Sequence, residues 1–400
     1  YRRDANGNLI YDAQGNPDYN YVNPVTPDFN PVGLSKLNEY NTKTARVITN
    51  PYAEVKFLNN FTAKTSVAAD YINNRERQFY NMEHGDGVSV KGRGYRHTRE
   101  DITLTFINTL NYNKSFGQHS VNVLVGQEAF RNKQDYIYTQ ATGFAFPGTK
   151  ELISASTPNT STSSFTEKRF ASYFSRLEYN FDSKYYVSGS LRRDGSSVFG
   201  TNNKYGTFYS FGGAWRIGRE KFLSDVNWIN ELKLRASYGT SGNDNIDRYA
   251  AQGLYSLGRN YEGQSGIVYT QLANPNLRWE QSAATDVSLE FSLFKGRFGG
   301  EVSYYKRGSK GILFGRQLTR LTGFDDLTTN LASMDNYGVE VLLNGTPVKN
   351  SNFTWDVSLN ITSNKNKINQ MTQNEVIDGT KRWKVGGDRY QWYLREYAGV

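Results

Sequence analysis

Apolar and polar side chains alternate along most of this sequence. The alternation is plainest between Arg169 and Gly239, in four runs that are each long for a soluble strand. In one run, Tyr209 and Phe211 fall on one face while Ser210 and Gly212 fall on the other. A side-chain period of two is typical of a β-strand with one apolar face. The pattern predicts about twelve strands, near residues 53–57, 61–71, 102–112, 121–138, 171–181, 185–192, 209–217, 232–238, 279–293, 298–304, 337–344 and 353–361.

The connections between these strands alternate in length. Short ones follow Leu58 and Tyr112 and also cover residues 181–184, 295–297 and 347–351. The connections between them are mostly long. One connection on the short side, at 218–230, is extended and has the pattern of a single helical turn. Short turns at one end and long loops at the other are typical of outer-membrane barrels. We therefore predict one barrel domain, with a loop at 1–42, strands and loops at 43–366, and a loop at 367–400.

A soluble β-sandwich would also alternate apolar and polar positions. Two features favour the barrel. Several strands keep their pattern for about ten residues, whereas soluble strands usually run for about five or six. The polar face also carries hydroxyl, amide and charged side chains strand after strand, as a water-filled lumen requires. The predicted fold class is all-β, an antiparallel transmembrane β-barrel.

Composition narrows the possible functions. No apolar run approaches the roughly 18–20 residues of a membrane-spanning helix, which excludes a helical membrane protein but not a barrel. Cysteine is absent, so the chain has no disulfide, thiolate metal site or cysteine nucleophile. The net charge of +9 comes from scattered Lys and Arg without a dense basic run. We therefore expect no nucleic-acid partner, although contact with outer-membrane lipid or lipopolysaccharide would suit this charge.

Six motifs carry a resemblance to a known family. The sequence resembles the SusC/RagA family of TonB-linked outer-membrane transporters at Leu191–Gly200, Ala214–Ile217, Glu220–Leu223, Leu232–Gly239, Asn274–Glu280 and Asp335–Glu340. The resemblance implies a barrel of about 22 strands in the outer membrane of a Gram-negative bacterium. It also implies active import of a bulky oligosaccharide or peptide, a SusD-like lipoprotein as lid, and a plug moved by TonB. The N-terminus lacks a signal peptide, so we expect an internal fragment whose plug and remaining strands lie elsewhere.

Two other functions stay open at this stage. A TonB-dependent receptor for a siderophore or cobalamin would have the same barrel, although the SusC-like motifs disfavour it. A soluble, glycan-binding β-sandwich is the alternative without transport, and it would fold in water without detergent.

No set of residues suggests catalysis, a cofactor or a metal. His84, His97 and His119 lack the spacing of zinc ligands. Residues 243–247 and 325–326 offer oxygens without the spacing of a calcium loop. Arg193-Asp194-Gly195 is best interpreted as a strand end, where Arg and Asp pair and Gly takes a positive φ. We therefore predict that the chain is not an enzyme.

Aromatic residues have two interpretations. Those near strand ends are candidates for the interfacial girdle of a barrel, namely Tyr179, Tyr185, Trp215, Trp228 and Trp279. Tyr255, Tyr261 and Tyr269, in the longest predicted loop, are candidates for stacking on a sugar ring or a peptide side chain.

Overall fold

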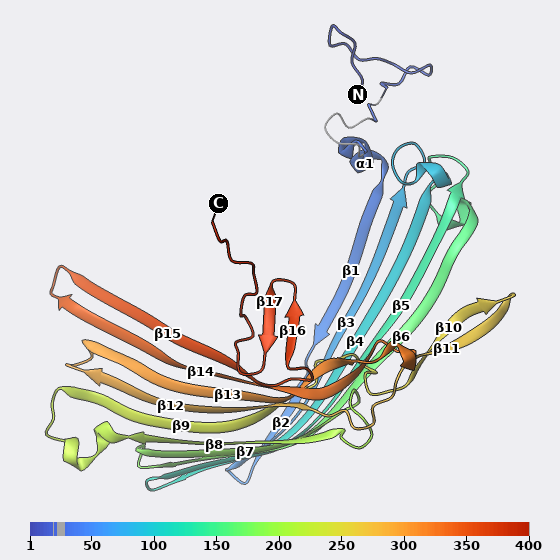
Figure 1. The fold of residues 1–400 in the computed structure, drawn as a ribbon. Coiled ribbons are helices and arrows are strands. Elements are labelled where there is room, and N and C mark those ends of the chain that lie inside the picture. Colours follow the sequence, from blue (N-terminus) through green and yellow to red (C-terminus); the bar gives the residue numbers. More distant parts are fainter. Residues whose placement is uncertain (19, 22–28, 400) are drawn as a thin grey trace. The chain divides into compact units, whose positions relative to one another are not determined.

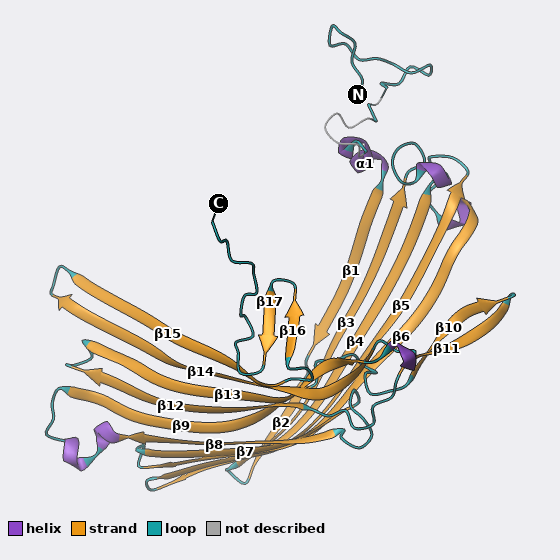
Figure 2. Ribbon diagram, in the orientation of Figure 1, coloured by secondary structure: helices purple, strands orange, loops and turns teal. Residues whose placement is uncertain are grey.

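The computed structural model describes residues 1–18, 20–21 and 29–399. Strands dominate it, and its helices are short (Figure 1 and Figure 2). The elements of the first part are α1 (Pro31–Leu37), β1 (Glu39–Thr49), β2 (Tyr52–Phe57), β3 (Phe61–Tyr80), β4 (Arg93–Phe116), β5 (His119–Phe144), β6 (Ala155–Phe181) and β7 (Tyr185–Ser196). They are followed by β8 (Tyr205–Arg216), β9 (Ile229–Asn243), β10 (Leu254–Tyr261), β11 (Gln264–Gln271), β12 (Glu280–Leu293), β13 (Phe298–Gln317), β14 (Asp326–Lys349), β15 (Thr354–Gln370), β16 (Glu375–Asp378) and β17 (Lys381–Lys384). Five 3-10 turns lie at Val88–Val90, Leu152–Ser154, Ile217–Arg219, Lys221–Leu223 and Arg320–Thr322.

One antiparallel sheet contains most of the strands. Its order is β1-β3-β4-β5-β6-β7-β8-β9-β12-β13-β14-β15, and β2 pairs with β3 beside this path. Neighbours in the sheet are mostly neighbours in the sequence, as in a meander. The hairpins β10-β11 and β16-β17 form separate two-stranded sheets. The predicted fold class and the number of about twelve strands are confirmed.

Tight turns join the strands where short connections are predicted. Leu58 and Asn59 have φ values of 48° and 58° between β2 and β3, and Asp182 and Ser183 have 51° and 50° between β6 and β7. Two consecutive residues with positive φ are characteristic of the turns whose twist matches that of the flanking strands. The predicted helical turn between β8 and β9 is present as the two 3-10 turns at Ile217–Arg219 and Lys221–Leu223.

The chain divides into two compact units. The first comprises residues 1–50, 67–105 and 131–167. In it, the Asn30 side chain accepts hydrogen bonds from the backbone at the start of α1. Phe79 and Phe144 form its buried aromatic pair, with ring centroids 4.9 Å apart. Glu151 forms ion pairs with Arg77 at 2.8 Å and with Arg96 at 3.1 Å.

The second unit comprises residues 51–66, 106–130 and 168–400. The two faces of its sheet differ sharply. A row of apolar side chains crosses six strands in register, from β8 to β15, and it consists of Trp215, Leu234, Leu289, Val302, Val341 and Ile361. Ile361 of this row is 53% exposed, and Phe211, on the same face of β8, is 62% exposed. Large apolar side chains this open to their surroundings are expected where lipid takes the place of a protein core.

Several strands are longer than the alternation predicts. Residues 139–170 separate two predicted strands, but β6 already begins at Ala155. The long loop at 240–277 contains β10 and β11. In β10 and β11 the apolar residues do not alternate with polar ones, since Ile267, Val268 and Tyr269 follow one another. The start of β6 is polar on both faces, so backbone pairing makes it a strand without leaving a period of two in the sequence. Its Thr residues favour this conformation.

The two predicted terminal loops also contain regular structure. Helix α1 and the start of β1 lie within residues 1–42. The end of β15 and the hairpin β16-β17 lie within residues 367–400. Part of the first loop, residues 19 and 22–28, lies outside the described residues.

Within the described residues, no helix has the length and apolar character that crossing a membrane requires.

Candidate functional site

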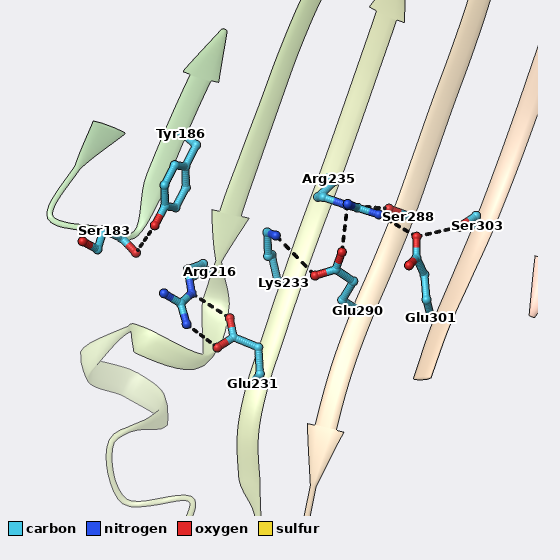
Figure 3. Close-up of polar contacts among 10 residues, drawn as sticks. All are labelled: Ser183, Tyr186, Arg216, Glu231, Lys233, Arg235, Ser288, Glu290, Glu301 and Ser303. Atoms are coloured by element: carbon cyan, nitrogen blue, oxygen red, sulfur yellow. Dashed lines mark hydrogen bonds and ion pairs between the residues drawn. The ribbon is translucent and has the colours of Figure 1, made fainter. Parts of the chain in front are cut away.

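A band of charged side chains crosses β8, β9, β12 and β13 (Figure 3). The strand register places it on the face opposite the apolar row. Lys233, Glu290 and Glu301 are register partners on three adjacent strands. Arg235 lies two residues beyond Lys233 and therefore points to the same face. We call this band the charge ladder; it consists of Arg216, Glu231, Lys233, Arg235, Glu290 and Glu301.

Each cation of the charge ladder contacts at least one carboxylate. Arg216 binds Glu231 through two parallel bonds, from Nε to Oε1 at 2.8 Å and from Nη2 to Oε2 at 2.5 Å. Lys233 Nζ lies 3.3 Å from Glu290 Oε2. Arg235 bridges two strands, because Nη1 lies 2.9 Å from Glu290 Oε1 and Nη2 donates to Glu301 Oε1 at 2.6 Å.

Two serines extend this network (Figure 3). Arg235 Nε donates to Ser288 Oγ at 3.1 Å, and Ser303 Oγ donates to Glu301 Oε1 at 3.0 Å. Both serines are nearly buried, whereas the charged side chains remain between 22% and 41% exposed. The three positive and three negative charges therefore cancel within a wall that still contacts solvent. Such pairs contribute little stability each, about 1 kcal/mol or less.

A recess of about 1180 Å³ lies against this wall. Besides most of the charge ladder, its lining includes Asn180 and Tyr186. Tyr186 donates its hydroxyl to the backbone oxygen of Ser183 at 3.1 Å. Asn180 Oδ1 is buried and has no hydrogen-bond donor within the described part of the chain. A recess lined by balanced charges offers hydrogen bonds to a polar solute. Among its described lining residues, no nucleophile lies beside a base.

A second polar cluster surrounds Arg192 on β7. Its guanidinium donates to Glu128 at 2.8 Å, to Asp194 at 2.7 Å and to the fully buried Ser172 at 2.8 Å. It also lies over the Phe174 ring, 5.3 Å from the centroid. These contacts fix neighbouring strands to one another, and we assign them a structural role.

The interpretation of Arg193-Asp194-Gly195 as a strand end with an ion pair is wrong in its details. Arg192, not Arg193, pairs with Asp194, and Arg193 lies over the Tyr205 ring. Strand β7 continues through Gly195, whose φ is not positive. A Cβ at Gly195 would lie 2.5 Å from the Tyr205 ring, so a larger residue here would displace that side chain.

Two sequence motifs that are far apart in the chain meet in a buried cluster. Phe199 and Leu277 come from the motifs at Leu191–Gly200 and Asn274–Glu280, and both are almost fully buried. Trp279 lies between Phe199 and Phe208, with centroid distances of 4.8 and 5.5 Å, and donates Nε1–H to Lys204 O at 3.0 Å. Trp279 is therefore a core residue, and its interpretation as an interfacial girdle residue is wrong.

Two of the other girdle candidates form a contact at the short-turn end of the strands. Tyr185 and Trp215 are register partners, and both donate to Glu220 Oε1, at 2.5 and 3.0 Å. The hydrogen bond from Tyr185 and, to a smaller extent, that from Trp215 lower the pKa of the Glu220 carboxyl below its usual value. Trp215 remains 36% exposed and Tyr185 41% exposed.

The hairpin β10-β11 brings together two of the three tyrosines proposed for ligand stacking. Tyr255 and Tyr269 are register partners whose ring centroids lie 4.9 Å apart. Tyr269 also contacts Phe324 at 5.3 Å, and its hydroxyl accepts from the Ala273 backbone at 3.2 Å. Tyr261 pairs with Gln264 at the other end of the hairpin and is 77% exposed. The role of these tyrosines in ligand binding stays a prediction.

The histidines and acidic residues make ordinary contacts. His84 is buried, whereas His97 and His119 have tyrosine hydroxyls near their rings, Tyr136 at 3.2 Å and Tyr179 at 2.7 Å. Across the described residues, no three His, Asp or Glu side chains gather in a way that could hold a metal ion.

The charge ladder is the feature that sequence reasoning missed. Lys233, Arg235 and Glu290 are assigned to the polar face from the alternation alone, but that assignment gives no partners. Only the register between β9, β12 and β13 brings the opposite charges together.

Three comparisons place this chain among known proteins. The family described as "TonB dependent receptor-like, beta-barrel" matches residues 1–400. TonB-dependent receptor P39 of Formosa agariphila is 31% identical over 370 residues, which cover 90% of this chain and 35% of that protein. TonB-dependent receptor SusC of Bacteroides thetaiotaomicron is 30% identical over 382 residues, which cover 91% of this chain and 37% of that protein.

Among solved structures, that of the RagAB peptide transporter matches with a TM-score of 0.87 and 27% identity. The match covers 98% of this chain and 44% of that one. The chain spans between 35% and 40% of the length of the curated relatives that it matches.

Proposed function

The chain belongs to the TonB-dependent receptor β-barrel family, and from this premise we propose that it is part of an importer for a bulky nutrient. The nutrient is an oligosaccharide or a peptide, and a SusD-like lipoprotein acts with the barrel. The family is one of outer-membrane receptors and transporters rather than enzymes. This chain supplies part of the barrel wall and its loops.

The observation that carries the proposal is the difference between the two faces of one sheet. The apolar row and the charge ladder occupy alternate positions of the same strands. Trp215 and Leu234 belong to the first, whereas Arg216 and Lys233 belong to the second. In a barrel these faces become the lipid surface and the lumen wall. A lumen wall with cancelling charges suits a large polar solute, because it offers hydrogen bonds without a strong preference for either sign of charge.

In the proposed mechanism, the loops of this chain act together with a lipoprotein lid, a plug and TonB. The ligand is held between the long loops and the lipoprotein lid. TonB then moves a plug within the barrel. Support for the nutrient class comes from the relatives: one is named SusC, and the matching RagAB structure is titled a peptide transporter. Because the strands of this chain form part of the path, the same ladder would contact either kind of nutrient.

A receptor for a siderophore or cobalamin remains the alternative. It would have the same barrel architecture, so the two-faced sheet does not separate the two functions. The SusC-like motifs, two of which form the buried cluster around Trp279, favour the nutrient importer.

The experiment is a purification of the full-length parent protein from its own outer membrane. A lipoprotein recovered at a one-to-one ratio would support the proposal, and nutrient uptake that stops when the proton gradient is dissipated would support its energy source. Recovery from the outer membrane without such a partner would favour the lone siderophore-type receptor. Recovery from the soluble fraction would overturn the barrel assignment.

A further inference from the structure

A small apolar pocket lies beside β13, β14 and β15 in the second unit. Its volume is about 200 Å³, and its walls are mostly apolar. Met334 and Ile368 are register partners in its floor, with Leu313 and Met371 beside them. Met334 lies two residues before Asn336 and six before Glu340, so it shares their polar face. The pocket therefore opens on the face of β14 that is opposite the apolar row.

Two residues near the hairpin β16-β17 give this pocket a polar side. Trp383 and Arg389 both line it, and the Arg389 guanidinium lies over the Trp383 ring, 6.0 Å from the centroid. Arg389 is exposed and forms no ion pair with any described residue. The buried Nε1–H of Trp383 has no acceptor within the described part of the chain. A buried donor that is left unpaired is unfavourable for the structure.

The size and lining of the pocket limit what can occupy it. A dry, apolar cavity of about 150 Å³ binds benzene, so this pocket has room for one large aliphatic or aromatic group. A sugar ring can stack its C–H faces on an aromatic ring but needs hydrogen-bond partners around its edge, and because the pocket walls are mostly apolar, few of its hydroxyls would find partners there. The lining thus disfavours an oligosaccharide and suits an apolar side chain.

Arg389, which has no ion pair among the described residues, limits the chemical class of the ligand further. A guanidinium binds a carboxylate through two parallel hydrogen bonds. An apolar side chain and a carboxylate occur together at the carboxyl end of a peptide. A carbonyl of the same residue would also give Trp383 Nε1 an acceptor, once a rotation of the indole uncovers that nitrogen.

We propose that this pocket binds the apolar side chain of the carboxy-terminal residue of an oligopeptide, whose carboxylate pairs with Arg389. The proposal rests on the proposed import function and selects the peptide from its two nutrient classes. The pocket lies apart from the charge ladder: no residue of the ladder lines it.

The test is a binding measurement by isothermal titration on the full-length receptor, purified with its co-isolated partner. The probes are the tetrapeptides Ala-Ala-Ala-Leu and Ala-Ala-Ala-Ser, the amide of the first, and maltohexaose. Burial of the leucine side chain is worth about tenfold or more in affinity, so the Leu peptide should bind at least about tenfold more tightly than the Ser peptide. The amide should bind more weakly than the free acid.

Three variants locate the binding. Arg389→Gln should abolish the difference between acid and amide. Ala332→Leu, which adds bulk to the pocket lining, should abolish the difference between the Leu and Ser peptides. Arg259→Gln, on the hairpin β10-β11, serves as the matched control and should change neither.

The outcomes separate this proposal from the import function. Equal affinities of the Leu and Ser peptides would overturn the pocket assignment. Binding of maltohexaose but not of peptides would also overturn it while leaving import of an oligosaccharide in place. Absence of binding together with absence of energy-dependent uptake in cells would overturn both.

Discussion

Replacement of Gly200 by alanine tests the contact between the two distant motifs. Gly200 donates its backbone N–H to Leu277 O at 3.0 Å. A Cβ at this position would lie 2.1 Å from Pro275 O and 2.3 Å from Pro275 C. Because ordinary van der Waals contacts begin near 3.4 Å, the two segments must move apart by roughly 1.3 Å. The obstacle is backbone on both sides, so no side-chain rotation relieves it.

We expect Gly200→Ala to destabilise the protein by about 3 kcal/mol, at the upper end of the usual cost of overpacking. Separation of the segments would also disturb the packing of Leu277, which is fully buried. The assay is the temperature at which the folded, fast-migrating form of the full-length protein is lost on an SDS gel. The midpoint should fall by several degrees relative to the parent protein.

Gly213→Ala is the matched control, because the nearest atom to a Cβ there is Tyr186 O at an ordinary 3.7 Å. Its midpoint should stay close to that of the parent. If Gly200→Ala and Gly213→Ala lost the folded form at the same temperature, the close approach of the two motifs would not stabilise the fold, and the reasoning would be refuted.

Three further predictions address the carboxyl at the short-turn end, the charge ladder and the lipid face. The lowered pKa of the Glu220 carboxyl contributes stability that is complete above its unfolded pKa of 4.5 and is lost as pH falls through its folded pKa. Between pH 6 and pH 3 the parent protein should therefore lose more stability than the Glu220→Gln variant. Equal losses of stability would contradict this. A double-mutant cycle of Arg235→Met and Glu301→Gln should give a coupling energy of about 0.2–1 kcal/mol, because the pair is partly exposed; a coupling above about 3 kcal/mol would show a much drier wall. Val287→Arg on the apolar face should cost about 2–4 kcal/mol in refolding from urea into lipid vesicles, whereas Ser237→Arg on the opposite face should cost far less; equal costs would disprove the assignment of the faces.

The alternation of side chains was sufficient to predict the strands whose two faces differ. In β8, Phe211 and Trp215 face one way and Ser210 faces the other, and the prediction of this strand is confirmed. The resemblance to the SusC/RagA family is also confirmed. By contrast, the first ten residues of β6 are polar on both faces, so only their pairing partners identify them as a strand.

The contacts of the site could not be predicted for a different reason. Alternation assigns Lys233 and Glu290 to one face, but it does not say which residues lie opposite each other in neighbouring strands. A slip of one residue in register moves every side chain to the other face. Similarly, nothing local to Trp279 distinguishes an interfacial side chain from a buried one. Its environment is set by Phe199 and Phe208, which are more than seventy residues away in the sequence.

The separation between the two joined motifs has a consequence for the order of folding. Phe199 and Trp279 close a segment that contains β8, β9 and the hairpin β10-β11. The tight turns at Leu58–Asn59 and Asp182–Ser183 instead join strands that follow one another directly. Closing a long segment costs more chain entropy than closing a short one. Chain entropy therefore favours formation of the β2-β3 and β6-β7 hairpins before that of the aromatic cluster, which joins residues about 80 positions apart.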